Sequence, residues 1–355
     1  MAKMSRIDLK DYGLSEALRL ETAQYPKLFV GRILSQSKGI YQVISEWGEF
    51  FAELSGRLRY GVIHAADYPA VGDFVMLDRQ SGDHGNGIIV HQLTRKSTFI
   101  RKAVGSSSDA QVIAANIDTV FICMSVNNDF NLRRLERYLS LVWESGATPV
   151  VVLTKIDLTD DLLTKFRAVA AVAIGVDILG ISTLKNEGYQ DLMAYLAVGQ
   201  TVALLGSSGV GKSTLINWLS GRQLFDTQAI RNDDKGRHTT TRRELIRLPD
   251  GGMLIDTPGM REIGMIDVTE GFDRTFSDVE TYLKTCHFRN CKHTNEPGCG
   301  IYAAIKAGQL SEQRWQAYLN LTRENDYFED KANYLKKKKE KFYQIARLNR
   351  NNKKH

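Results

Sequence analysis

A glycine-rich stretch in the second half of the chain has the residue types and spacing of a phosphate-binding loop. Gly206 and Gly211 are separated by four residues and followed by Lys212 and a hydroxyl residue, which is the pattern GxxxxGK[ST]. Glycines let successive N–H groups turn inward around phosphate oxygens. The lysine reaches the β and γ phosphates, and the hydroxyl binds Mg²⁺. The candidate phosphate-binding residues are Gly206, Ser207, Ser208, Gly209, Val210, Gly211, Lys212, Ser213 and Thr214, with Lys212 also a candidate catalytic residue and Ser213 a candidate Mg²⁺ ligand.

A second motif indicates the triphosphate end of the same site. The tetrapeptide Asp256–Gly259 begins at the last residue of the apolar run 252–256, where we expect a strand. An aspartate at a strand end can hold Mg²⁺ through water, and the N–H of Gly259 can meet a γ-phosphate. Asp256 and Gly259 are therefore candidate nucleotide-binding residues.

A third motif indicates recognition of a base. It follows the apolar run 148–153 and ends in Asp157. This carboxylate can accept hydrogen bonds from N1–H and the exocyclic amine of guanine, a donor pair that adenine lacks. The motif favours GTP over ATP, and competition between the two nucleotides tests the alternative of a P-loop ATPase. The candidate guanine-binding residues are Thr154, Lys155, Ile156 and Asp157, with Ser182 after the next apolar run.

A cysteine and histidine cluster near the C-terminus indicates a metal site. Three of the four cysteines, Cys286, Cys291 and Cys299, fall within fourteen residues. His293 lies among them, and His287 competes with it from directly beside Cys286. Three thiolates and one imidazole form a soft tetrahedral set that suits structural Zn²⁺. The spacing favours a metal site over a disulfide framework.

The composition is that of a globular protein with an uneven positive charge. The 355 residues are 43% apolar and 25% charged, with a net charge of +6. Residues 331–355 hold ten Lys or Arg and one Glu. We expect this basic tail to contact nucleic-acid phosphates, with a solubilising tail as the alternative. The chain has no signal-peptide pattern and no apolar run near about eighteen residues, so we predict a cytoplasmic protein without a membrane segment.

The elements that position these motifs fall into separate domains. Five short runs with turns between them predict a small barrel of the oligonucleotide-binding (OB) kind, at 28–34, 39–44, 50–54, 73–77 and 87–93. Its aromatic residues either stack on RNA bases or fill the core: Tyr41, Trp47, Phe50, Phe51 and Tyr60. We interpret residues 95–102 as a basic linker and 105–109 as flexible.

From residue 117 the chain alternates apolar runs with helical patterns. This alternation predicts a mostly parallel sheet covered on both faces, with ligands at the carboxyl ends of its strands. We predict a multidomain protein with an N-terminal OB-fold β-barrel, a central α/β P-loop domain and a C-terminal zinc-binding α-helical domain. The expected boundaries are an extension at 1–26, the barrel at 27–103, the P-loop domain at 110–272, the zinc-binding domain at 273–330 and the basic tail at 331–355.

The order of the motifs resembles that of a circularly permuted GTPase. In Ras-like GTPases the phosphate loop comes first, whereas here Asp157 and Ser182 precede it and Asp256 follows it. With a barrel in front and the Cys/His cluster behind, residues 28–305 resemble the RsgA family of small-subunit ribosome biogenesis GTPases, also called YjeQ or YloQ. Thr154 departs from the common pattern, because most GTPases place asparagine there. We therefore assign guanine specificity to Asp157.

The resemblance also implies roles for the segment between the phosphate loop and Asp256. Residues 236–242 fit the switch that senses the γ-phosphate, and either Thr240 or Thr241 is expected to bind Mg²⁺. Met260 stands where Ras-like enzymes place a glutamine that orients water. His238 is the candidate replacement and a candidate catalytic residue, because a neutral imidazole can orient water or accept its proton.

The resemblance implies partners and a reaction. We expect a monomeric enzyme that binds the small ribosomal subunit and its rRNA late in maturation, hydrolyses GTP to GDP and phosphate, and then leaves. Mg²⁺ accompanies the nucleotide, and one structural Zn²⁺ is held by Cys286, Cys291, His293 and Cys299. The alternative is an RNA-binding module that uses GTP as a conformational ligand with incidental hydrolysis. Turnover with and without small subunits separates the two.

Overall fold

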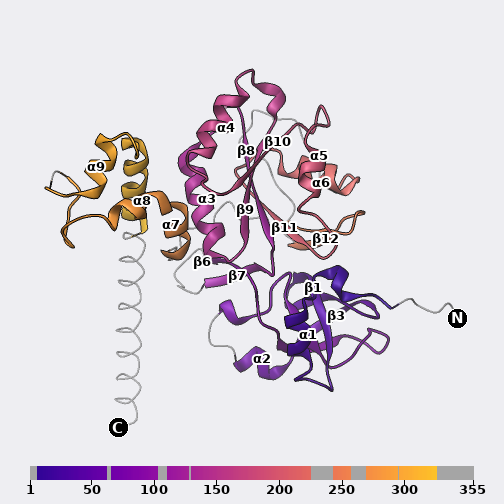
Figure 1. The fold of residues 1–355 in the computed structure, drawn as a ribbon. Coiled ribbons are helices and arrows are strands. Elements are labelled where there is room, and N and C mark those ends of the chain that lie inside the picture. The colour runs from indigo at the N-terminus through magenta and orange to yellow at the C-terminus, as the bar shows by residue number, and fades with distance from the viewer. Residues whose placement is uncertain are drawn as a thin grey trace, which may run out of the picture.

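The chain folds into a small β-barrel, a larger α/β sheet and a C-terminal group of helices (Figure 1). The structure is a computed structural model that describes residues 6–61, 65–102, 110–127, 129–224, 243–256, 269–294 and 296–325. Among these residues, no helix has both the length and the apolar character needed to cross a bilayer. The predicted fold class, an N-terminal OB-like barrel, a P-loop domain and a C-terminal helical body with a Cys/His cluster, is confirmed.

The N-terminal barrel has the strand order β1-β2-β3-β5-β4 and closes by pairing of β1 with β4. Side chains alternate in and out along a strand, and the inward residues Ile33, Val43 and Leu77 are fully buried. The strands are β1 (Phe29–Ser37), β2 (Ile40–Ser45), β3 (Gly48–Leu54), β4 (Phe74–Leu77) and β5 (Gly87–Gln92). Short helices surround it, namely η1 (Leu9–Tyr12), α1 (Glu16–Thr22), α2 (Gly56–Gly61) and η2 (Ala65–Asp67).

The aromatic residues of the barrel divide into two groups. Tyr41 and Phe50 are buried in its core. Trp47, Phe51 and Tyr60 are exposed to 43%, 55% and 85%. Of the five aromatic residues predicted either to stack or to fill the core, these three are exposed enough to stack on a base.

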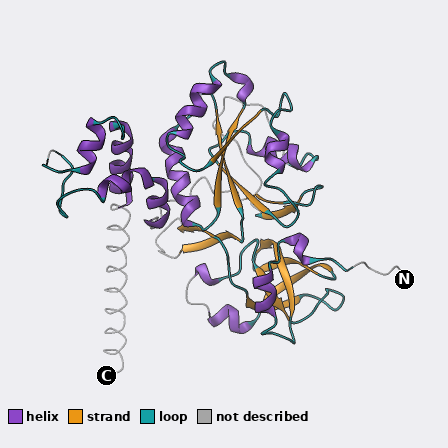
Figure 2. Cartoon of the chain, in the orientation of Figure 1, coloured by secondary structure: helices purple, strands orange, loops and turns teal. Residues whose placement is uncertain are grey.

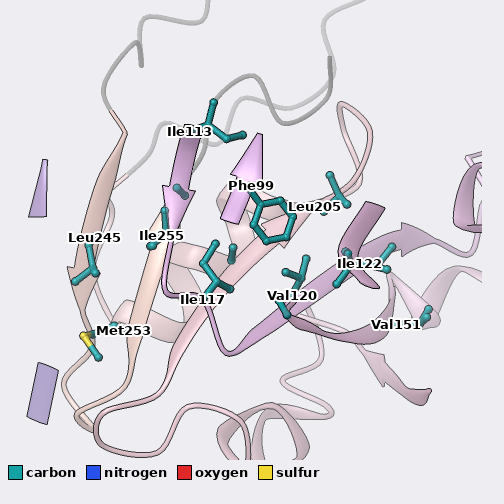
Figure 3. Packing of buried hydrophobic residues seen from close by; sticks show 14 of the residues in the cluster. Phe99, Ile113, Ile117, Val120, Ile122, Val151, Leu205, Leu245, Met253 and Ile255 are labelled. Carbon is teal, nitrogen blue, oxygen red and sulfur yellow. The ribbon is translucent and has the colours of Figure 1, made fainter. Parts of the chain in front are cut away.

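The segment predicted to be a basic linker is instead a strand. β6 (Thr98–Lys102) pairs antiparallel with β7 (Ala110–Ala115). Phe99 is 2% exposed and belongs to the main apolar cluster with Val120 and Ile122 (Figure 3). Arg95 is not solvated either, because its guanidinium is bonded to the buried carboxylate of Asp73. The linker prediction was wrong because it gave more weight to the basic charge of the segment than to its apolar residues, of which Phe99 is buried. Residues 105–109, which we predicted to be flexible, lie outside the described residues.

The central sheet has the order β10-β9-β8-β11-β13-β12, and only β12 runs antiparallel to its neighbour β13. Helices α3 and α4 cover one face, and α5 and α6 cover the other (Figures 1 and 2). Both faces are covered, so β8 and β11 are buried along their whole length. The elements are β8 (Thr119–Ser125), α3 (Leu132–Glu144), β9 (Thr148–Thr154), η3 (Ile156–Leu158), α4 (Leu162–Ala170), β10 (Asp177–Ile181), α5 (Tyr189–Met193), β11 (Thr201–Leu205), α6 (Lys212–Ser220), β12 (Glu244–Arg247) and β13 (Met253–Asp256).

A buried arginine joins the barrel to the central sheet. Arg32 of β1 is 1% exposed, and burial lowers the pKa of its guanidinium to about 10. The group therefore stays charged at neutral pH. Its N–H groups donate to the carbonyl oxygens of Tyr12, Gly72 and Asn116 and to the hydroxyl of Thr201. Strand β1 also pairs with β12, so the barrel and the central sheet form one hydrogen-bonded sheet.

The C-terminal helices pack against α3 of the central domain. Arg314 is almost fully buried, and its guanidinium lies 2.6 Å from a carboxylate oxygen of Glu136 on α3 and 3.0 Å from one of Asp278. A Cβ on Gly271 would lie 2.0 Å from the carbonyl oxygen of Ser140, so only glycine allows this approach. The elements are α7 (Thr269–Thr275), α8 (Ser277–Leu283), α9 (Gly300–Lys306) and a helix at 312–325. The basic tail lies outside the described residues.

Candidate nucleotide site and metal centre

The glycine-rich stretch connects β11 to α6, as the motif requires. Gly206, Gly209 and Gly211 have φ angles of 154°, 78° and 102°. A Cβ on Gly206 would lie 2.4 Å from the carbonyl oxygen of Cys123, so this position has no room for a side chain. Val210 is fully buried and anchors the loop, while Ser208, Gly209 and Ser213 are exposed. The loop therefore presents a solvent-accessible backbone at the helix start, where anions bind.

Lys212 folds back over the loop. Its ammonium donates to the carbonyl oxygens of Gly206 at 2.6 Å and Ser207 at 2.5 Å. These contacts place the positive charge above the backbone that would surround a phosphate. A phosphate oxygen offers a stronger acceptor than a carbonyl, so the lysine is in position to exchange partners when an anion enters.

The guanine motif is tied directly to the phosphate loop. The hydroxyl of Thr154, at the end of β9, donates to the carbonyl oxygen of Val210 at 2.6 Å. Lys155 has a left-handed φ of 58°, and its ammonium donates to the carbonyl oxygen of Gly209 at 2.8 Å. Threonine therefore supplies a side-chain bond between the two motifs, although asparagine is the commoner residue at its position.

Ser182, a candidate guanine-binding residue, contacts the aspartate of the guanine motif. Its hydroxyl donates to a carboxylate oxygen of Asp157 at 2.5 Å, and it accepts a hydrogen bond from the N–H of Lys185. Ser182 also forms a β-bridge with Glu187, which closes the loop. The serine thus orients the Asp157 carboxylate, whose second oxygen is not used in this bond.

The Mg²⁺ end of the site is described only in part. Asp256 ends β13, which lies parallel and next to β11. Its carboxyl group therefore lies at the same sheet edge as the phosphate loop. The predicted residues His238, Thr240, Thr241 and Gly259 lie outside the described residues.

Two residues at this edge were not predicted from the sequence. Asp129 and Arg134 follow β8, and both contact the hydroxyl of Ser207 in the phosphate loop. Their position after the carboxyl end of a parallel strand was the available signal. Their meeting with Ser207 depends on strand order, since the three residues are far apart in the sequence.

The Cys/His cluster is assembled by the C-terminal helices. The ligand atoms of Cys286, Cys291, His293 and Cys299 all lie within 4.8 Å of one another. The Sγ of Cys286 accepts from the N–H of Gly300, which is the kind of support a thiolate needs. His293 rather than His287 joins the cluster, since the His287 ring packs on Phe288. The set fits Zn²⁺, which prefers three thiolates and an imidazole to an oxygen-rich site.

Comparison with known proteins agrees with this geometry. The family model described as RsgA GTPase matches residues 92–266. The chain is 46% identical over 322 residues to the small ribosomal subunit biogenesis GTPase RsgA 2 of Lactiplantibacillus plantarum, with 90% of each chain covered. The chain belongs to the RsgA GTPase family. As a member of the RsgA family it is a GTP hydrolase, as predicted.

Two solved structures share the fold of this RsgA-family chain. The crystal structure of YjeQ from Thermotoga maritima has a TM-score of 0.63 at 26% identity and covers 84% of this chain and 98% of that one. The structure of YloQ, described as a circularly permuted GTPase, has a TM-score of 0.61 at 28% identity, with 84% and 95% covered. The permuted motif order predicted from the sequence is therefore confirmed.

Proposed function

We propose that this GTPase binds the small ribosomal subunit, acts in its late maturation and uses GTP hydrolysis to drive its own release. The observation that carries the proposal is the bond between Thr154 and Val210, which joins a guanine motif to a phosphate loop at one sheet edge. The small ribosomal subunit is proposed as the partner because the relatives are named small ribosomal subunit biogenesis GTPases.

The candidate site residues have different roles in nucleotide binding and hydrolysis. Lys212 and the loop N–H groups neutralise phosphate charge, and Asp157 accepts the two guanine donors. Ser213 and one of Thr240 and Thr241 would bind Mg²⁺, and Asp256 would support it through water. When bound, Mg²⁺ neutralises charge on the β and γ phosphates. The nucleotide-binding set is Thr154, Lys155, Ile156, Asp157, Ser182, Gly206, Ser207, Ser208, Gly209, Val210, Gly211, Lys212, Ser213, Thr214, Asp256 and Gly259.

The other parts of the chain serve the ribosomal partner. The outward aromatics of the barrel suit stacking on unpaired bases, and the basic tail suits rRNA phosphates, so binding should weaken steeply with salt. Cys286, Cys291, His293 and Cys299 would hold one structural Zn²⁺.

We place the protein in the cytoplasm as a monomer, with the domain boundaries at 26/27, 103/110, 272/273 and 330/331.

GTP turnover measured with and without purified small subunits tests this function. Stimulation of turnover by the subunits supports the proposal. Nucleotide-dependent subunit binding without stimulated turnover would favour an RNA-binding module that uses GTP as a conformational ligand.

His238→Ala should sharply reduce the stimulated turnover, because the position after Gly259 is Met260, which cannot orient water. Loss of a water-positioning or charge-stabilising group is worth about 10³-fold or more in related enzymes. The affinity for GTP should stay within about twofold, since the imidazole acts on water rather than on the nucleotide.

His84→Ala is the matched control, because His84 is an exposed histidine of the barrel. Unchanged stimulated turnover in His238→Ala would remove His238 from the mechanism.

A further inference from the structure

The phosphate loop is held from outside by a charged pair. The hydroxyl of Ser207 donates to one carboxylate oxygen of Asp129 at 2.5 Å and accepts from the guanidinium of Arg134 at 2.8 Å. The other oxygen of Asp129 lies 2.5 Å from the same nitrogen of Arg134. The three side chains therefore close a ring in which the Ser207 hydroxyl uses both its donor and an acceptor position.

This ring fixes Ser207 at the start of the phosphate loop, whereas Lys212 at the end of the loop must exchange a carbonyl acceptor for a phosphate. The carbonyl oxygen of Ser207 accepts from Lys212 at 2.5 Å. When Lys212 turns to a phosphate, Ser207 loses that bond, and its side-chain contacts with Asp129 and Arg134 remain to hold the first turn. Gly206 beside it already has a backbone geometry that only glycine adopts easily. The pair can therefore preserve the shape of the loop through the exchange.

The pair also sets the charge beside the loop. The Asp129 carboxylate lies next to a backbone that would bind several negative charges, which by itself opposes binding. Arg134 offsets this charge through a direct ion pair, and about a third of each side chain or less is exposed. The loop N–H groups therefore face the nucleotide without a net negative neighbour.

Local structure places both residues for this task. Asn131 caps α3, and its side chain accepts from the N–H of Arg134, so the arginine leaves the first turn of the helix. The N–H of Asp129 donates to the side chain of Asn127, whose oxygen also accepts from Ser125 at the end of β8. The pair thus rests on the strand and helix that flank it.

We propose that Asp129 and Arg134 are positioning residues of the nucleotide site, which hold Ser207 and keep the charge next to the phosphate loop balanced. This inference rests on the proposed nucleotide site and adds specific residues to it. It implies an asymmetry: removing the cation leaves an uncompensated carboxylate beside the phosphates, whereas neutralising the carboxylate leaves a cation there.

Calorimetric titration with GTP and GDP in the presence of Mg²⁺ tests the asymmetry. Arg134→Met should weaken GTP binding about tenfold, the size of one charge-assisted hydrogen bond. The loss should be smaller for GDP, which carries less charge, and smaller in high salt. Asp129→Asn should bind GTP at least as tightly as the wild type, and the double variant should return to within about threefold of it.

Arg133→Met is the matched control, because Arg133 is an exposed arginine on the same helical turn. It should change GTP affinity by less than about twofold, and Arg134→Lys should recover part of the loss. Equal losses in both single variants, independent of salt and of phosphate number, would mean a structural role only and would overturn the proposal. Absence of binding by the wild type would instead reject the nucleotide site itself.

Discussion

Cys299→Ser is expected to unfold the C-terminal helical body while the barrel and the central sheet stay folded. Cys299 is 3% exposed, contributes to the Cys/His cluster and caps α9 by accepting from the N–H of Tyr302. Binding of structural Zn²⁺ to peptides of this kind is worth about 10–16 kcal/mol. The apolar cluster of this body includes Cys299 itself, and Cys286 and Cys291 pack against it, so loss of the metal would disturb this core directly.

Two measurements check this expectation, namely zinc content by elemental analysis and the sites of limited proteolysis. In Cys299→Ser the zinc content should fall below half, and cleavage should concentrate between residues 273 and 325. His287→Ala is the control, because its side chain lies beside Cys286 but outside the cluster. Loss of zinc in His287→Ala, with zinc retained in His293→Ala, would contradict the ligand set.

Asp157→Asn is expected to exchange guanine for xanthine as the preferred base. The carboxylate would accept two hydrogen bonds from guanine, each worth about 1.5–3 kcal/mol when one partner is charged. The amide loses one of the two acceptors and presents a donor to the guanine amine, so GTP affinity should fall by about a hundredfold or more. Xanthine has a carbonyl in place of the amine, so the amide donor gains a partner.

Competition of GTP, XTP and ATP against a fluorescent guanine nucleotide measures this change. Asp160→Asn is a matched control, because Asp160 is an exposed aspartate in the same loop. If Asp157→Asn kept its preference for GTP over XTP, base recognition would have to be assigned to another residue. The Ser182 hydroxyl should remain bonded to the amide oxygen, so a loss of loop structure is not expected.

The sequence predicted those features that depend on local pattern. The phosphate loop has its fixed residues within nine positions, and the barrel strands alternate inward and outward residues between turns. The motif order was sufficient to predict the permutation. Each of these signals lies within a short stretch and needs no knowledge of distant neighbours.

The features that the sequence did not predict depend on which elements meet in space. β6 contains basic residues, and only its pairing with β7 and the burial of Phe99 distinguish it from a linker. The contact of Ser207 with Asp129 and Arg134 requires β8 to lie beside β11. Ser182 was a candidate guanine-binding residue, but the bond from its hydroxyl to Asp157 depends on how the loop closes.

The joint at Arg32 limits how this protein can be divided. An isolated barrel would expose a guanidinium whose acceptors Asn116 and Thr201 remain on the other fragment, and would leave the edge of β1 without its partner β12. An isolated central sheet would in turn expose the groups that the arginine covers. The barrel therefore cannot be exchanged for another barrel as an independent domain. A barrel transplanted from another protein would need an equivalent arginine and an equivalent strand edge to dock on this sheet.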